Sequence, residues 1–171
     1  KIIQKYKKFY NLRIIGMGGS ILGTEAICSF LKDKIKKNIF FINNLNSKNL
    51  NLNEKNFLNL IVSKSGNTLE TISNSNILIN KKDANIFITE NRDSYLRNIA
   101  NQLRAEIIDH NNFIGGRYSV LSEVGMLPIE LVGLNPKKFK QLNYLVKNRN
   151  FLNSLVQNVS NTISLIKKKK I

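Results

Sequence analysis

The sequence predicts an α/β fold in which a five-stranded parallel sheet lies between two layers of helices. Short runs rich in β-branched residues alternate with helical patterns along the first 110 residues, and such alternation is typical of right-handed βαβ units. The length of 171 residues and the hydrophobic content of 42% suit one ordinary globular domain. In this architecture ligands bind beyond the carboxyl ends of the strands, so the loops that follow the strands are the candidate binding segments.

The elements are read from the spacing of apolar residues. Strands are expected over residues 12–15, 39–42, 58–62, 85–88 and 106–108. Helices are expected over residues 21–31, 68–79 and 94–103. The asparagine-rich stretch before the third strand is expected to be a loop with a short helix. After Gly115-Gly116 the pattern turns helical up to Pro136 and beyond.

The ends of the sequence suggest that it is cut from something longer. It begins with Lys, and it stops after an apolar pattern of helical spacing that is followed by neither a Gly cap nor a Pro stop. That pattern comprises Leu152, Leu155, Val159, Ile163 and Ile166.

Composition excludes several classes of protein. No apolar run approaches the roughly 18–20 residues that a membrane span needs, and no secretory signal stands at the start. The single cysteine, Cys28, forms neither an internal disulfide nor a cysteine zinc site. We therefore expect a soluble, cytoplasmic protein without a metal or a cofactor.

The formal net charge of +16 invites comparison with nucleic-acid binders. A bias in base composition is the alternative, because Lys, Asn and Ile are abundant and all three can be encoded by A and T alone. We favour the bias in base composition and expect neither nucleic acid nor membrane as a partner. Binding of nucleic acid by the basic ends of the chain stays open as an alternative function.

The loop after the first strand is rich in glycine, from Gly16 to Gly23. Glycines between a strand and a helix let backbone N–H groups approach an anion. The dinucleotide fingerprint would require glycine at Ile21, and the nucleotide P-loop would require Lys at Thr24, so neither motif fits. Two interpretations stay open: an anion-binding turn, or a turn that only starts a helix with Ser20 as its cap.

The loop after the third strand reads Ser63-Lys64-Ser65-Gly66-Asn67-Thr68. Hydroxyl groups and free N–H groups at a helix start form a cradle for a dianion. A capping box is the alternative, but it accounts for one or two hydroxyls only. We favour phosphate binding.

The loop after the fifth strand carries Gly115-Gly116-Arg117-Tyr118-Ser119. The glycines permit a sharp turn that presents a guanidinium group at the same sheet edge, where it suits an oxyanion that develops during a reaction. An arginine that merely bridges surface groups is the alternative.

Together the three loops, with the continuation Val124-Gly125-Met126-Leu127-Pro128, resemble the glucose-6-phosphate isomerase family from about residue 12 to 135. The resemblance implies a sugar isomerase domain, with a three-layer sandwich, a five-stranded parallel sheet and flavodoxin-like strand order. It also implies reversible isomerisation of glucose 6-phosphate to fructose 6-phosphate through a cis-enediol(ate), and a homodimer in the intact enzyme.

The resemblance further implies roles for individual residues. The substrate phosphate is expected to bind Ser63, Ser65 and Thr68 with the backbone around Lys64. Gly19, Ser20 and Gly116 are expected to line the sugar, and Arg117 to be catalytic. The base glutamate of the family lies farther downstream than this sequence extends. His110 is interpreted as a strand-end residue and Glu70 as structural, whereas Glu123 offers itself as a substitute base.

These implications define a domain organisation and an alternative function. Residues 1–135 are expected to form the sugar isomerase domain, and residues 136–171 a helical extension that leads to a second domain absent from this sequence. Alone, the chain is expected to be inactive. The alternative is a non-catalytic, regulatory module that binds a sugar phosphate.

Overall fold

The computed structural model describes residues 2–45, 56–80, 83–139, 141 and 143–169. Its strands are β1 (Asn11–Gly16), β2 (Asn38–Ile42), β3 (Phe57–Val62), β4 (Ala84–Thr89) and β5 (Glu106–Asp109). Its α-helices are α1 (Ile2–Tyr6), α2 (Leu22–Phe30), α3 (Leu69–Leu78), α4 (Tyr95–Gln102), α5 (Glu123–Leu131), α6 (Pro136–Phe139), α7 (Asn143–Lys147) and α8 (Arg149–Lys169). Short 3₁₀ helices are η1 (Gly18–Ser20), η2 (Lys32–Lys34) and η4 (Gly116–Leu121).

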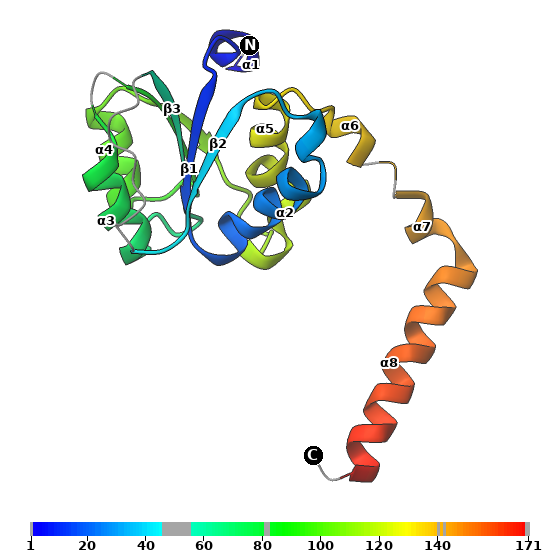
Figure 1. Ribbon diagram of the computed structural model, residues 1–171. Helices are drawn as coiled ribbons and strands as arrows, with labels where there is room; N and C mark the ends of the chain where they lie inside the picture. Colours follow the sequence, from blue (N-terminus) through cyan, green and yellow to red (C-terminus); the bar gives the residue numbers. More distant parts are fainter. Residues whose placement is uncertain (1, 46–55, 81–82, 140, 142, 170–171) are drawn as a thin grey trace. The chain divides into compact units, whose positions relative to one another are not determined.

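The five strands form one parallel sheet in the order β2-β1-β3-β4-β5. This confirms the predicted three-layer α/β fold with flavodoxin-like order. Figure 1 shows α3 and α4 on one side of the sheet and α2 and α5 on the other. The strand order reverses direction between β1 and β3, and a crevice forms at such a switch point, beyond the carboxyl ends of the strands.

Alternate residues of the central strands fill two cores, as the pleat requires. Ile14, Leu60 and Ile86 belong to the core beneath α2 and α5, which also contains Val124 and Leu131. Ile15, Ile61 and Phe87 belong to the core beneath α3 and α4. Both faces of the sheet are therefore buried, which explains the nearly continuous apolar runs of the strands.

A buried row of polar side chains crosses the three central strands on the α3 and α4 side. Arg13 pairs in register with Asn59, and Asn59 with Asn85. Arg13 Nη1 donates to Asn59 Oδ1 (3.2 Å) and to the Leu78 carbonyl oxygen (3.1 Å), and Asn59 Nδ2 donates to Asn85 Oδ1 (2.9 Å). These bonds satisfy groups that would otherwise be costly to bury.

Most predicted elements are confirmed within a few residues, and one region differs. The helix expected after Gly116 is divided into η4 and α5, and α5 ends at Leu131, just before Gly133 with its φ of 93°. The part of the asparagine-rich stretch that comprises residues 46–55 lies outside the described residues.

The chain divides into two compact units, Lys1–Pro136 and Lys137–Ile171. The second unit contains α8, which confirms the helix expected from the C-terminal apolar spacing. Its large apolar side chains are exposed, for example Leu155 at 45% and Ile163 at 47%. Among the described residues, no helix is both long enough and apolar enough to cross a membrane.

Candidate phosphosugar site

The three motifs lie in loops at the carboxyl ends of β1, β3 and β5. They are called here the glycine loop (residues 17–21), the hydroxyl loop (residues 63–68) and the arginine loop (residues 110–117). The glycine loop and the hydroxyl loop follow β1 and β3, the two strands at the switch point of the sheet. The site therefore occupies the place where α/β sheets of this kind bind ligands.

The glycine loop is packed directly on the arginine loop. A Cβ atom at Gly19 would lie 2.6 Å from the Arg117 amide nitrogen and closer still to the Gly116 carbonyl group. Ser119 Oγ lies near both loops, 2.6 Å from the Gly116 carbonyl oxygen and 3.3 Å from that of Gly19. Only glycine permits this approach, which brings Gly19 together with Gly116 and Arg117.

The interpretation of Ser20 as the cap of α2 is wrong. Ser20 ends η1, and Ile21 occupies the N-cap position of α2 without any side-chain cap. The short 3₁₀ turn that intervenes between the glycines and α2 moves Ser20 away from the helix start. Its hydroxyl is therefore not used to start α2.

The hydroxyl loop gathers three hydroxyl groups at the start of α3. Thr68 Oγ1 lies 3.0 Å from Ser63 Oγ and 3.5 Å from Ser65 Oγ. Thr68 is the N-cap residue of α3, yet its side chain accepts no cap hydrogen bond. The capping box is therefore not formed, and the helix start retains backbone N–H groups for an anion.

Gly66 gives this loop its shape. Its φ is 66°, a conformation that other residues rarely adopt, and a Cβ atom there would lie 2.6 Å from Ser94 Cβ. The Gly66 amide donates to Ser63 Oγ (3.2 Å) and the Asn67 amide to Ser65 Oγ (3.2 Å). The hydroxyls are thus held in place by the backbone of their own loop.

The side chain of Lys64 points away from these hydroxyls. Its ammonium group donates to the carbonyl oxygens of Asn112 and Ile114, both at 2.9 Å, and lies 3.3 Å from Glu90 Oε1. Glu90 follows β4, is 7% exposed, and also pairs with Arg92 at 3.0 Å. Sequence reasoning missed Glu90, because a lone acidic residue after a strand carries no signal by itself.

Arg117 is exposed at the start of η4. Within the described part of the chain, its guanidinium group makes no hydrogen bond or ion pair. The group is therefore available to a ligand at the edge where the glycine loop and the arginine loop meet.

His110 and Glu123 both contact Asn111 at this edge. His110 follows β5, is 2% exposed, and its Nδ1 donates to the Asn111 carbonyl oxygen (2.9 Å), since a carbonyl oxygen only accepts. Glu123 Oε1 accepts from the Asn111 amide (2.9 Å) and lies 3.6 Å from His110 Nδ1. These contacts fit the interpretation of His110 as a strand-end residue. They also engage Glu123, which sequence reasoning had considered as a base.

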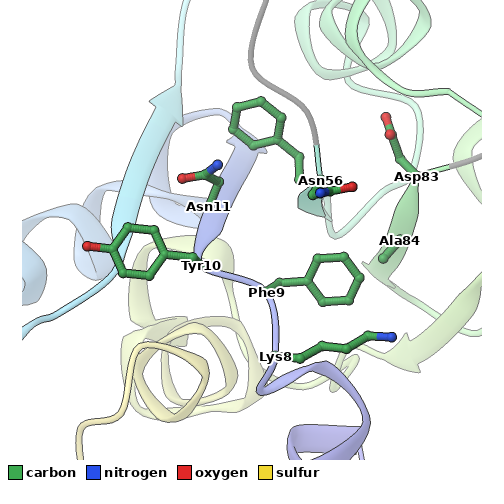
Figure 2. Close-up of a pocket in the computed structure, with 8 residues that line it drawn as sticks. Lys8, Phe9, Tyr10, Asn11, Asn56, Asp83 and Ala84 are labelled. Carbon is green, nitrogen blue, oxygen red and sulfur yellow. The ribbon is translucent and has the colours of Figure 1, made fainter.

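No group of three metal-ligating side chains occurs among the described residues. A pocket of about 680 Å³ lies at the opposite edge of the sheet, among residues at or before the starts of β1, β3 and β4. Figure 2 shows Lys8, Asn11 and Asp83 around it. It includes no residue of the three motif loops.

Comparisons with solved structures agree with this fold. The hypothetical protein TT0462 from Thermus thermophilus matches with a TM-score of 0.75 and 19% identity, covering 92% of this chain and 44% of that chain. The tagatose-6-phosphate ketose/aldose isomerase of Escherichia coli matches with a TM-score of 0.60 and 17% identity, covering 90% of this chain and 46% of that chain. The fold is that of a sugar isomerase domain.

Sequence comparison identifies the family. The family model described as phosphoglucose isomerase matches residues 3–167. A glucose-6-phosphate isomerase of Borreliella burgdorferi (strain ZS7) is 36% identical over 183 residues, which cover 88% of this chain and 34% of the relative. This chain belongs to the phosphoglucose isomerase family, and it spans about a third of the length of the curated relatives it matches.

Proposed function

We propose that this chain supplies the phosphosugar-binding half of an active site that interconverts glucose 6-phosphate and fructose 6-phosphate. The observation that supports this most directly is the hydroxyl cluster of Ser63, Ser65 and Thr68 at the uncapped start of α3. Hydroxyl donors and free helix N–H groups together suit a phosphate dianion without a metal.

The remaining residues are assigned by the resemblance to the family, and the contact between Gly19 and the arginine loop supports the assignment. Gly19, Ser20 and Gly116 line the sugar, and the backbone at Lys64 joins the phosphate contacts. The guanidinium of Arg117 stabilises the negative oxygen of the cis-enediolate, which forms when a base removes the proton from the carbon next to the carbonyl group. The same base returns the proton to the former carbonyl carbon, and a hydroxyl proton passes from one oxygen of the intermediate to the other, so no co-reactant is consumed.

We propose that the base comes from a part of the protein outside this sequence. Two carboxylates beside the motif loops already have partners: Glu90 binds Lys64 and Arg92, and Glu123 binds the Asn111 amide. We further propose that residues 1–135 form the sugar-binding domain and residues 136–171 lead to a second one. The intact enzyme is proposed to be a cytoplasmic homodimer.

The second candidate function is a non-catalytic module that binds a sugar phosphate. The engagement of Glu90 and Glu123 favours it, because binding requires the cradle but no base. The isomerase and the non-catalytic module both predict binding of a sugar phosphate. Only the isomerase predicts turnover by a protein with the full length of the relatives.

Titration of the 171-residue chain with glucose 6-phosphate, followed by NMR or calorimetry, tests the shared part of both proposals. We expect weak binding, no binding of glucose, and loss of most of the affinity in Ser63→Ala. Ser29→Ala, an exposed serine of α2 outside the three loops, is the matched control and keeps wild-type affinity. Equal binding of glucose and glucose 6-phosphate would contradict the phosphate cradle.

A coupled assay with fructose 6-phosphate tests the assignment of the base. The 171-residue chain is expected to show negligible turnover. Measurable turnover that depends on chain concentration would refute the proposal that the base lies elsewhere.

A further inference from the structure

The side chain of Lys64 connects three loops rather than facing the phosphate cradle. An ammonium group has three N–H donors, and here three acceptors surround it: the carbonyl oxygens of Asn112 and Ile114 at 2.9 Å each and Glu90 Oε1 at 3.3 Å. All three donors are used inside the protein. The cation is therefore committed to the arginine loop and to the end of β4.

The middle of the arginine loop depends on this lysine. Other backbone hydrogen bonds of residues 112–114 stay inside the loop: the Phe113 amide donates to Asn111 Oδ1 and the Ile114 amide to the Asn111 carbonyl oxygen. The Phe113 side chain is 97% exposed and adds no packing. In the described part of the chain, Lys64 alone ties residues 112–114 to another loop by hydrogen bonds.

Lys64 is itself firmly placed. Its carbonyl oxygen accepts from the Glu90 amide (3.1 Å) and from Thr89 Oγ1 (3.3 Å), so its backbone is anchored to the end of β4. The carboxylate of Glu90, whose side chain is 9% exposed, then holds the ammonium group from the same element. Because both its backbone and its ammonium group are anchored, the Lys64 side chain keeps little rotamer freedom and can hold the arginine loop in a fixed position.

We propose that Lys64 and Glu90 form a positioning pair that holds the arginine loop against the hydroxyl loop and so sets the distance between Arg117 and the phosphate cradle. The expected effect on catalysis rests on the proposed function. The connection that Lys64 and Glu90 make between the loops does not depend on it. Lys64 thus contributes its backbone to phosphate binding, and its side chain acts through Arg117. A lysine that binds phosphate directly is the competing interpretation.

Hydrogen–deuterium exchange of the ligand-free 171-residue chain tests the mechanical connection. Lys64→Met and Glu90→Gln are expected to speed exchange in the peptide 111–118 by about 10-fold, while the peptide that covers β4 stays protected. In the double variant the effects should not add, since both substitutions break one connection. Lys37→Met is the matched control, because Lys37 also donates to a backbone carbonyl oxygen, that of Lys7 at 3.0 Å, but outside the three loops.

Kinetics test the consequence in a protein that contains this chain and isomerises the substrate. Displacement of a catalytic group by about 1 Å costs up to about 100-fold, so Lys64→Met should lower kcat by roughly 10- to 100-fold with little change in KM. A rise in KM at unchanged kcat and unchanged exchange would overturn the proposal and assign Lys64 to the phosphate. Unchanged exchange in 111–118 for both variants would overturn it as well.

Measurements of sugar-phosphate binding and of hydrogen–deuterium exchange test the proposed function and this inference separately. Wild-type chain that binds no sugar phosphate would refute the function, while faster exchange in the variants would still support the positioning pair. If Lys64→Met does not fold, Glu90→Gln carries the test, because a glutamine fills the same space and removes the charge that holds the ammonium group of Lys64.

Discussion

Substitution of Gly19 by alanine tests whether the contact between the glycine loop and the arginine loop is required. A Cβ atom at this position would lie 2.6 Å from the Arg117 amide nitrogen, whereas ordinary contacts begin at 3.4 Å. The shortfall of about 0.8 Å is a minimum, because the Gly116 carbonyl group lies closer still. These are backbone atoms, so no side chain can rotate away, and the two loops must separate.

Overpacking of this kind costs about 1–3 kcal/mol. For a chain of this size, each kcal/mol lowers Tm by about 2–4 °C. Thermal unfolding followed by circular dichroism should therefore show a Tm for Gly19→Ala that is lower by roughly 2–12 °C. The separation also displaces Arg117, so affinity for glucose 6-phosphate or turnover should fall with stability.

Gly116→Ala is the matched control for this experiment. A Cβ atom on Gly116 meets nothing within 4 Å, so its effect on stability should stay within about 0.5 kcal/mol. The two glycines are neighbours across the same contact and differ only in the space around them. Equal Tm values for Gly19→Ala and Gly116→Ala would refute the reasoning, since they would show that the loops do not constrain one another.

Two further predictions concern Arg117 and Cys28. In an active protein that contains this chain, Arg117→Ala should lower kcat by about 10²- to 10³-fold, because a donor to the enediolate oxygen is lost. The affinity for phosphate should change much less. An unchanged kcat would refute the proposed role of Arg117. Burial raises the pKa of the Cys28 thiol to about 11 from an ordinary 9.0, so at about pH 8 Ellman's reagent should react roughly 100-fold more slowly with folded than with urea-unfolded chain. Equal reaction rates of folded and unfolded chain would contradict the burial of Cys28. Because the thiol of the unfolded chain ionises first, ionisation of Cys28 should lower the free energy of unfolding as pH rises from about 9 to about 11.

The sheet was predictable because its signals are local. Each strand is an apolar run between polar loops, and burial of both faces makes that run nearly continuous. Even β3, which carries Asn59 at its centre, was recognised from its apolar neighbours. What spacing could not reveal is why a fully buried asparagine is tolerated there: its partners Arg13 and Asn85 come from strands 46 and 26 residues away.

The details of the site were less predictable because their causes are not local. The capping interpretation of Ser20 is wrong because a 3₁₀ turn precedes α2, and the helix expected after Gly116 begins as η4. Ser119 and Ser122 donate to backbone carbonyl oxygens of residues 116 and 119, and such local bonds compete with regular α-helix. The direction of the Lys64 side chain depends on acceptors 26 to 50 residues away, which no motif encodes.

The pairing of charges at the carboxyl edge of the sheet bears on the kind of ligand that this edge suits. Three basic side chains in or beside the described loops pair with carboxylates: Lys64 and Arg92 with Glu90, and Arg97 with Asp109. Arg117 is the basic side chain of those loops that makes no such pair in the described residues. A polyanion requires many unpaired cations along a surface, whereas one guanidinium beside a cluster of hydroxyls suits a single small dianion. The excess of lysine elsewhere in the chain therefore says little about the ligand, and the pairing of charges within the loops says more.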